Sequence, residues 1–382
     1  MTSYEIPFNR ARAFGDEMRY VAESLSTGHI SSNGPFGAKC SALLEELLDG
    51  PRVLLTTSCT HALEICARLL DLEPGDEVVV PSFAFVSTAA AFALHGARPV
   101  FADVRPDTLN LDVDAVRAKL TDRTRAVVAL HYAGVGCEMD ALGDLCRERG
   151  VRLIEDAAHG LFGTYRGRPL GSFGDLGAVS FHETKCVTCG EGGALLVGDE
   201  GLLERARILR AKGTDRHRFE AGLVDAYTWV DHGSNYALSD LSAAFLYGQL
   251  EEREAIREHR RALWDRYDAE LGGWAAAHGV GRPRVPGHCR HTSLLYYLVL
   301  PDRAVRDRLI AHLRSLGIVA AFHYPPLHLS RMGRRYGGRP GDCPVTERVS
   351  DCLVRLPLYN AMTLEDQTKV LGAILEPACL SG

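Results

Sequence analysis

The sequence predicts an α/β protein with a mostly parallel sheet of seven strands and a smaller α+β domain at its C-terminal end. Over the first two thirds of the chain, short β-branched runs alternate with helical patterns. Most of these runs are uniformly apolar, which is typical of parallel strands that helices bury on both faces. With 382 residues, the chain is also too long for one compact core.

The elements of the first two thirds are predicted in alternating order. The expected strands cover residues 53–56, 78–80, 99–101, 126–130, 151–155, 177–181 and 193–197. The expected helices cover residues 60–70, 86–95, 112–119, 138–149 and 200–211. Such alternation predicts one continuous doubly covered sheet rather than several small ones.

The last third has a different pattern. From residue 239, a helical pattern rich in Glu and Arg runs through residue 250 to about residue 271 and is expected to connect two domains. An extended segment and two helices follow, at 293–300, 304–315 and 363–375. We therefore expect a large domain at 1–250 and a small α+β domain at 251–382.

Composition excludes several classes of protein. The chain is 46% hydrophobic and 24% charged, as in ordinary soluble proteins, and its net charge of -6 disfavours nucleic-acid binding. No apolar run approaches the length of about 18 residues needed to cross a membrane, so a cytoplasmic protein is expected. The 11 cysteines include residues inside apolar helices, such as Cys66 and Cys146, so free thiols are expected.

One of the five lysines stands in a setting suited to covalent chemistry with a carbonyl. Lys185 follows an apolar strand that ends at Ser180, and its loop carries hydroxyls and closes on three glycines. An amine held there could form a Schiff base with an aldehyde cofactor. The other lysines are expected on solvated faces: Lys39, Lys119, Lys212 and Lys369.

Cys186 and Cys189 form a C-x-x-C pair beside this lysine. A zinc site would need a second ligand pair at finger-like spacing, which the sequence lacks. A thioredoxin-type site would need the pair at the start of a helix, whereas these cysteines lie in a Gly-rich turn. The sequence therefore predicts neither a metal site nor thiol-redox chemistry.

A second motif runs from the strand at 53–56 through Ser58, Cys59 and Thr60 into a helix. Hydroxyl residues at a helix N-terminus leave N–H groups unpaired at the positive end of the helix dipole, which favours a phosphate. A Ser or Thr at this position is more often only an N-cap. Taken alone, the motif leaves both interpretations open.

A third motif places Glu155 and Asp156 at the end of a buried strand. A carboxylate there faces the crevice in which open α/β sheets bind ligands, and it could keep a pyridine nitrogen protonated so that the ring accepts an electron pair. Capping of the following helix is the alternative. Phe85, just after another strand, could lie over a flat ring, although core packing would explain it equally well.

Five motifs are distributed along the chain: PGDEV at 74–78, EDAA at 155–158, SFHETK with GEGG at 180–193, NYALSD at 235–240 and HYPPLH at 323–328. In combination, and over nearly the whole chain, they resemble the pyridoxal-phosphate-dependent nucleotide-sugar aminotransferases of the DegT/DnrJ/EryC1/StrS family. RPDT at 105–108 and KGT at 212–214 are similar to the branch that aminates dTDP-4-oxo-6-deoxy-D-glucose.

The resemblance implies a type I aminotransferase fold, like that of aspartate aminotransferase, and the cofactor pyridoxal 5′-phosphate. Lys185 would bond to the cofactor and shuttle the proton. Asp156 would pair with the pyridinium nitrogen, Phe85 would stack on the ring, and His159 would lie near the ring and its phenolic oxygen. Many family members have Gln where His159 stands.

The cofactor's phosphate is expected to be held by Thr60, by the adjacent backbone at Cys59 and by Ser180. Asn235 would reach this phosphate from the neighbouring subunit of a homodimer with shared active sites. Two departures from the family bear on binding. Cys59 stands where Gly is frequent, and Ala237 replaces an Arg, so sugar contacts of that Arg do not carry over.

The implied reaction moves an amino group from L-glutamate to the C4 ketone of dTDP-4-keto-6-deoxy-D-glucose, giving a galacto or gluco 4-amino-4,6-dideoxyhexose. An aminotransferase for a C3 ketosugar and a non-catalytic binding or regulatory protein on the same scaffold are the alternatives. Retention of Lys185 with Asp156 argues against the non-catalytic alternative. Sugar dehydratases of the family carry His in place of Lys185.

Overall fold

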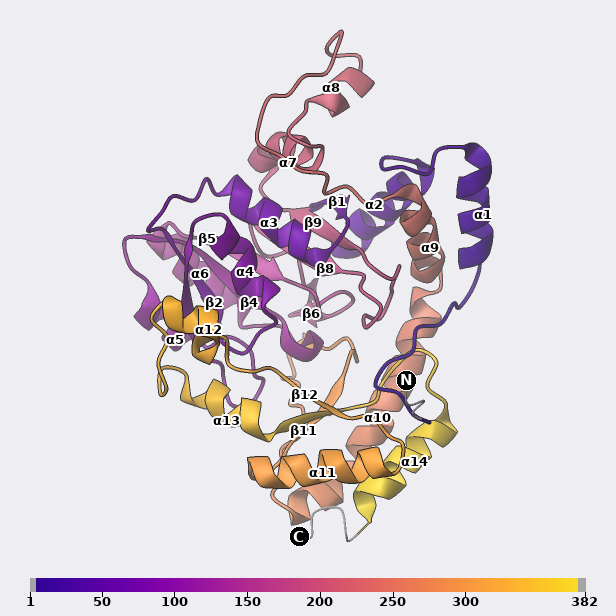
Figure 1. Ribbon diagram of the computed structural model, residues 1–382, viewed down its shortest axis with the longest axis vertical. Helices are drawn as coiled ribbons and strands as arrows, with labels where there is room; N and C mark the ends of the chain where they lie inside the picture. Colours follow the sequence, from indigo (N-terminus) through magenta and orange to yellow (C-terminus); the bar gives the residue numbers. More distant parts are fainter. Residues whose placement is uncertain (1–4, 377–382) are drawn as a thin grey trace.

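The large sheet has seven strands in the order β1-β9-β8-β5-β4-β2-β3 (Figure 1), in a computed structural model that describes residues 5–376. The strands are β1 (Arg52–Thr56), β2 (Glu77–Pro81), β3 (Arg98–Ala102), β4 (Thr124–Leu130), β5 (Arg152–Asp156), β8 (Leu176–Ser180) and β9 (Gly193–Val197). Only β9 runs antiparallel to its neighbours, β1 and β8. The predicted mostly parallel, seven-stranded sheet is confirmed.

Every predicted strand of this sheet is present, and each end lies within two residues of its predicted position. One small shift matters for the site. The strand expected at 151–155 is β5 at 152–156, because its pairing with β4 begins at Arg152 and continues to Asp156, which pairs with Leu130. Asp156 is therefore the last residue of the strand.

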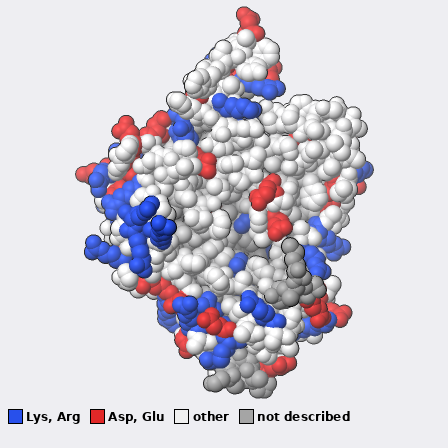
Figure 2. Space-filling view, viewed as in Figure 1, with Lys and Arg blue, Asp and Glu red and all other residues white. Residues whose placement is uncertain are grey.

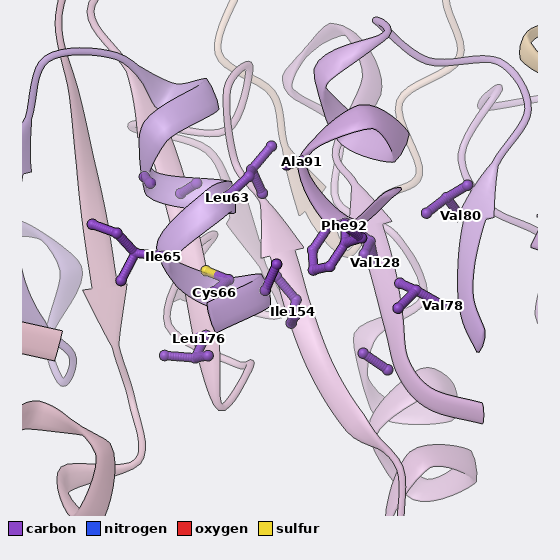
Figure 3. Close-up of a cluster of buried hydrophobic side chains, with 14 of the residues drawn as sticks. Leu63, Ile65, Cys66, Val78, Val80, Ala91, Phe92, Val128, Ile154 and Leu176 are labelled. Atoms are coloured by element: carbon purple, nitrogen blue, oxygen red, sulfur yellow. The ribbon is translucent and has the colours of Figure 1, made fainter. Parts of the chain in front are cut away.

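Both faces of the sheet are buried. Val78 and Val80 of β2 pack in a core cluster with α3 (Cys59–Leu69) and α4 (Ser87–Leu94), as Figure 3 shows. Val79 points to the opposite face, where it packs with α5 (Val113–Lys119) and α6 (Met139–Arg149). Because successive side chains of a strand alternate between faces, burial on both sides explains the uniformly apolar runs.

The second part of the chain forms a three-stranded antiparallel sheet in the order β11-β13-β12. Its strands are β11 (Tyr296–Val299), β12 (Ala321–Phe322) and β13 (Leu353–Leu356), and its helices are α11 (Arg303–Ser315), α13 (Pro344–Cys352) and α14 (Leu364–Leu375). Ile6 bridges to Ile318 and packs in this part's core. The division at residue 250 remains a proposal.

The expected connecting helix is two helices. α9 (Asp240–Glu251) ends and α10 (Arg253–Ala277) begins around Glu252, which has φ -86° and ψ 12°. α10 then runs along the right of Figure 1 toward α11 and α14. The remaining elements are α1 (Glu17–Thr27), α2 (Pro35–Leu48), α7 (Leu203–Arg210), α8 (Arg216–Glu220), α12 (Arg331–Arg335), β6 (Thr164–Tyr165), β7 (Arg168–Pro169), β10 (Cys289–Arg290), and the short 3-10 helices Tyr132–Gly134, Glu200–Leu202 and Leu327–Leu329.

The surface carries charges of both signs. On the face in Figure 2, Lys and Arg side chains gather over α12, whereas elsewhere on this face basic and acidic side chains are interspersed. The segment around α8 projects from the body at the top of Figure 1 and exposes several apolar side chains: Phe219, Leu223, Tyr227, Trp229 and Val230. Within residues 5–376, no helix is both long and apolar enough to cross a membrane.

Candidate active site

A cavity of about 460 Å³ lies where the large sheet meets the second part of the chain. Its walls come from the ends of β5 and β8, the starts of α3 and α4, the loop after β8, and β13. Most of the predicted site residues line it: Cys59, Thr60, Phe85, Asp156, His159, Ser180 and Lys185. Asn235 does not line this cavity; it is exposed and bridges to Ala211.

Lys185 lies in the loop between β8 and β9. Its backbone N–H donates to the carbonyl of His182 at 2.9 Å, which tightens the turn around it. Burial lowers the pKa of Lys185 below its ordinary value, although the carboxylate of Asp156 opposes this shift. A lower pKa raises the share of free amine at neutral pH, and the free amine is the form that attacks a carbonyl.

Asp156 is 3% exposed and has two hydrogen-bond donors. Thr88 Oγ1 donates to its Oδ2 at 2.7 Å, and the N–H of Ala158 donates to its Oδ1 at 3.2 Å. Burial nevertheless raises the pKa of Asp156 above its ordinary value, with these two bonds acting in the opposite direction. A cationic group placed beside Asp156 would restore its ionised form.

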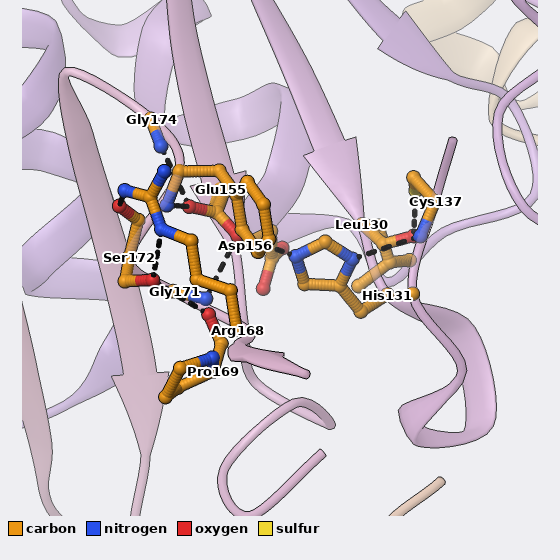
Figure 4. Close-up of polar contacts among 12 residues, drawn as sticks. Leu130, His131, Cys137, Glu155, Asp156, Arg168, Pro169, Gly171, Ser172 and Gly174 are labelled. Atoms are coloured by element: carbon orange, nitrogen blue, oxygen red, sulfur yellow. Dashed lines mark hydrogen bonds and ion pairs between the residues drawn. The ribbon is translucent and has the colours of Figure 1, made fainter. Parts of the chain in front are cut away.

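Glu155 has a different role from its neighbour, because the strand turns successive side chains to opposite faces (Figure 4). It accepts N–H bonds from the loop before β8: Gly171 at 2.7 Å, Phe173 at 2.5 Å and Gly174 at 2.7 Å. His131 Nε2 lies 2.8 Å from Glu155, while His131 Nδ1 accepts the N–H of Cys137 at 3.2 Å. Glu155 therefore holds the scaffold and takes no part in the cavity.

The N-terminus of α3 opens into the cavity. Ser58 is its N-cap, with Oγ accepting the N–H of His61 at 3.1 Å. The N–H groups of Cys59 and Thr60, at the first two helical positions, bond to no described residue. Thr60 Oγ1 lies 2.8 Å from Ser87 Oγ at the start of α4. Unpaired N–H groups, hydroxyls and a helix dipole together favour a phosphate here.

Gly193 explains part of the glycine-rich motif. A Cβ at this position would stand 2.3 Å from the backbone nitrogen of Cys59 and 2.4 Å from the carbonyl carbon of Ser58. Only glycine allows the turn before α3 to pack this closely on β9. The motif beside Lys185 thus also positions the N-terminus of α3.

Two histidines also line the cavity, His159 and His323. His159 Nδ1 accepts the N–H of Ala133 at 3.3 Å, and the OH of Tyr132 is hydrogen-bonded to His323 Nδ1 at 3.0 Å. The two imidazoles lie 6.3 Å apart with 9° between their planes. Burial, with the nearby cations, holds the pKa of both rings well below the ordinary value. Both histidines are therefore neutral at pH 7.

Several cavity residues have no role in the sequence-based prediction. Thr88, which bonds Asp156, stands three residues after Phe85 in a motif that was interpreted only for its aromatic ring. His323 and Tyr324 begin the HYPPLH motif. Arg355 interrupts the apolar strand β13, and an arginine in such a strand was the available signal.

The model of the DegT/DnrJ/EryC1/StrS aminotransferase family matches residues 13–375. The chain belongs to this family. The prediction of a pyridoxal-phosphate-dependent sugar aminotransferase is confirmed, and with it the predicted type I fold.

Individual relatives align with almost the whole length of this aminotransferase. The spore coat polysaccharide biosynthesis protein SpsC of Bacillus subtilis is 30% identical, over 97% of this chain and 96% of its own. The crystal structure of the aminotransferase TlmJ from Streptoalloteichus hindustanus is 34% identical, with a TM-score of 0.88, and covers 98% of this chain and 97% of its own. The pyridoxal-phosphate form of the putative sugar aminotransferase Spr1654 from Streptococcus pneumoniae is 25% identical, with a TM-score of 0.89 and 97% coverage of both chains.

The cavity of this aminotransferase fits pyridoxal 5′-phosphate by its chemistry. The amine of Lys185 has a lowered pKa and lies in the cavity, the buried carboxylate of Asp156 has no ion pair within the described residues, and the unpaired N–H groups of Cys59 and Thr60 suit a phosphate. Phe85 leaves 59% of its surface exposed at the cavity, so an aromatic face is free to cover a ring. These four features match the four parts of the cofactor.

Neutralisation of the two adjacent carboxylates should affect the stability of the cofactor-free protein to different extents. Glu155→Gln should lower the free energy of unfolding by about 2–4 kcal/mol, because an amide cannot accept all of its N–H and imidazole donors. Asp156→Asn should change it by less than about 1 kcal/mol, since it removes a charge that burial disfavours.

Urea unfolding of both variants measures this difference. Because burial raises the folded-state pKa of Asp156, its ionised form destabilises the fold above the unfolded pKa, and that cost fades as the pH falls through the folded pKa. The stability gap between wild type and Asp156→Asn should accordingly shrink at acid pH. Equal losses for both variants at neutral pH would mean that Asp156 is a structural carboxylate like Glu155.

Proposed function

We propose that this aminotransferase transfers an amino group from L-glutamate to the C4 ketone of dTDP-4-keto-6-deoxy-D-glucose. The observation that carries the proposal is one cavity in which Lys185 and Asp156 face the unpaired N-terminus of α3. The substrate is supported by the motifs RPDT at 105–108 and KGT at 212–214, which resemble the branch acting on this sugar nucleotide.

The bound cofactor supplies an electron sink that stabilises a carbanion at the substrate carbon. Lys185 would accept the proton that leaves the amino-acid Cα and donate it to the cofactor. Its lowered pKa suits a base that works near neutral pH. Asp156 keeps a proton on the ring nitrogen, which restores the carboxylate's own ionised form. Phe85 would cover one face of the ring, and His159 would contribute a neutral N–H near its oxygen.

The phosphate is held by the N–H groups of Cys59 and Thr60, by the Thr60 hydroxyl and by Ser180. The Cys59 thiol does not compete for this site as an anion, because burial raises its pKa well above the ordinary value. The departure from glycine at this position therefore leaves the backbone contact intact and adds only the bulk of a thiol.

Lys185 should be the residue that bonds covalently to the cofactor. The purified enzyme should absorb near ~420 nm, lose this band with excess L-glutamate, and carry a stable adduct on Lys185 after borohydride reduction. Peptide mass spectrometry locates the adduct. Lys185→Ala should retain the cofactor but react at least ~10³-fold more slowly. An adduct on any other lysine would contradict the assignment.

The sugar substrate is tested by a panel of 3-keto and 4-keto nucleotide sugars with L-glutamate as donor. The expected result is one product with its amine at C4, and NMR coupling constants of that product show whether the amine is axial or equatorial. Amination at C3 alone would replace the proposed reaction with the C3 alternative. Bound cofactor without turnover of any ketosugar would favour a binding protein.

We further propose that the working unit is a homodimer in which each subunit completes the other's site. Asn235 supports this idea, because it is exposed and lies outside the cavity of its own chain. The projecting segment around α8, just before it, exposes Trp229 and Leu223, apolar side chains that a partner would cover. A two-fold interface is self-complementary, so both sites would be completed together.

Mixing two inactive variants tests for shared sites. A Lys185→Ala chain exchanged with an Asn235→Ala chain should recover toward about a quarter of wild-type activity, because half of the dimers are mixed and each has one intact site. Mixing Lys185→Ala with Asp156→Ala is the matched control and should recover nothing, since both residues line one chain's cavity. Confirmed exchange without recovery in the first mixture would exclude shared sites.

A further inference from the structure

Arg260 of α10 is the largest fully buried side chain in the described part of the chain, at 1% exposed. The hydrogen bonds of its guanidinium reach four neutral oxygens. Its Nη2 donates to the carbonyls of Leu294 at 2.6 Å and Leu358 at 3.1 Å. Its Nε donates to the carbonyl of Ser293 at 3.3 Å, and its Nη1 donates to Oδ1 of Asn360 at 2.6 Å. Because a buried charge is costly unless it is bonded, these four bonds fix the guanidinium in one place.

The four acceptors belong to two segments that bound the cavity. Ser293 and Leu294 precede β11, and Leu358 and Asn360 follow β13. Leu294 and Leu358 line the cavity. Ser293 has a left-handed backbone, with φ 53°, which a residue with a side chain adopts only where its surroundings hold it. Arg260 therefore fixes one side of the cavity from outside its lining.

Asn360 continues this network to the loop that carries Lys185. It is 3% exposed, and its Nδ2 donates at 2.9 Å to the carbonyl of Cys186, the residue after Lys185. Its two partners decide how the amide is oriented. A guanidinium only donates and a carbonyl only accepts, so Oδ1 must face Arg260 and Nδ2 must face Cys186. The hydrogen bonds therefore run from Arg260 through Asn360 to the backbone beside Lys185.

The Lys185 loop has two further contacts of this kind. The Sγ of Cys186 donates to the carbonyl of Thr292 at 3.7 Å, which gives the first cysteine of the C-x-x-C pair a packing role. The side-chain amide of Asn9 donates to the carbonyl of Glu183 at 3.1 Å, but this bond is exposed and Asn9 itself lines the cavity. Asn360, in contrast, holds the loop by a buried bond from outside the cavity lining.

We propose that Asn360, held in place by Arg260, is a positioning residue for Lys185, and that through it the second part of the chain sets where the reacting amine lies. This inference rests on the proposed transamination. Asp156 and the N-terminus of α3 belong to the large sheet and its helices, so Lys185 is the group that the second part can move relative to them. Displacement of a reacting group by about 1 Å can slow a reaction by about 10²-fold without any lost contact to the substrate.

Two substitutions of Asn360 separate this link from the stability of the fold. Asn360→Ala removes both of its side-chain bonds. Asn360→Asp keeps an oxygen for Arg260 and adds an ion pair, but it offers no N–H to the carbonyl of Cys186. Gln367→Ala is the matched control, because Gln367 is also buried and its Nε2 donates at 2.6 Å to the carbonyl of Leu263 in α10 rather than to the loop after β8. Urea unfolding compares the stability of each variant with that of wild type.

The first measurement is the pH profile of Lys185 acetylation in the cofactor-free protein, followed by peptide mass spectrometry. Its midpoint reports the pKa of the amine, which burial lowers in wild type. In both Asn360 variants the midpoint should move to higher pH by about 0.5 pH unit or more, because a loosened loop returns the amine to solvent. Asp156 and Arg355, whose charges act on the amine, are unchanged in every variant. Gln367→Ala should keep the wild-type midpoint even though it lowers stability.

The second measurement is the single-turnover reaction of the cofactor-loaded enzyme with L-glutamate over a range of donor concentrations. Both Asn360 variants should lower the maximal rate by about 10-fold or more. The half-saturating concentration should change by less than about 3-fold, since Asn360 does not line the cavity. Gln367→Ala should change neither quantity.

Three results would overturn the inference. Wild-type acetylation profiles in both Asn360 variants would show that the bond to Cys186 does not position the amine. An equal shift in Gln367→Ala would assign the effect to stability alone, and a fully active Asn360→Asp would reduce Asn360 to a support for Arg260. A wild-type enzyme that does not react with L-glutamate would instead contradict the proposed function, whereas the acetylation profile, which needs neither donor nor cofactor, would still decide the positioning of Lys185.

Discussion

The buried carboxylate of Asp156 is the constraint on which the site depends. A charge at the carboxyl end of a parallel strand, 3% exposed, is costly, and burial raises its pKa despite the bonds from Thr88 and Ala158. The same burial lowers the pKa of Lys185. Both shifts disfavour charge in the cavity. Both therefore favour a ligand that places a protonated nitrogen beside the carboxylate and a carbonyl beside the amine.

Two neighbouring residues at the end of β5 have different roles: Glu155 holds the surrounding loop, and Asp156 lines the cavity. Glu155 gathers three backbone N–H groups and an imidazole on one face of the sheet, which fixes the loop ahead of β8. Asp156 faces the cavity on the other side. The close approach of α3 to Gly193 places the unpaired N-terminus of α3 at the same edge of the sheet. The parallel topology brings these parts together, because the strands it aligns end at one edge.

The sequence predicted the sheet well because its strands are buried on both faces and therefore uniformly apolar. It did not predict α1, whose buried residues are Glu17, Tyr20 and Ser24, since a polar inner face leaves no apolar periodicity. In the site, Cys59, Thr60, Asp156 and Lys185, which belong to local motifs, line one cavity, whereas Asn235 of the NYALSD motif does not line it. His323 and Arg355 were missed as site residues because the HYPPLH motif was used only for the family resemblance and the arginine within β13 was not singled out, and because the second part of the chain carries both residues to the cavity.

The central claim is that Asp156 holds a proton on the ring nitrogen of the cofactor. The most direct measurement is the ¹⁵N chemical shift of that nitrogen, after the cofactor-free enzyme is reconstituted with pyridoxal 5′-phosphate labelled there. The nitrogen should be protonated in wild type from about pH 6 to pH 9 and unprotonated in Asp156→Asn at neutral pH. An unprotonated nitrogen in wild type, or the same shift in both proteins, would contradict the claim.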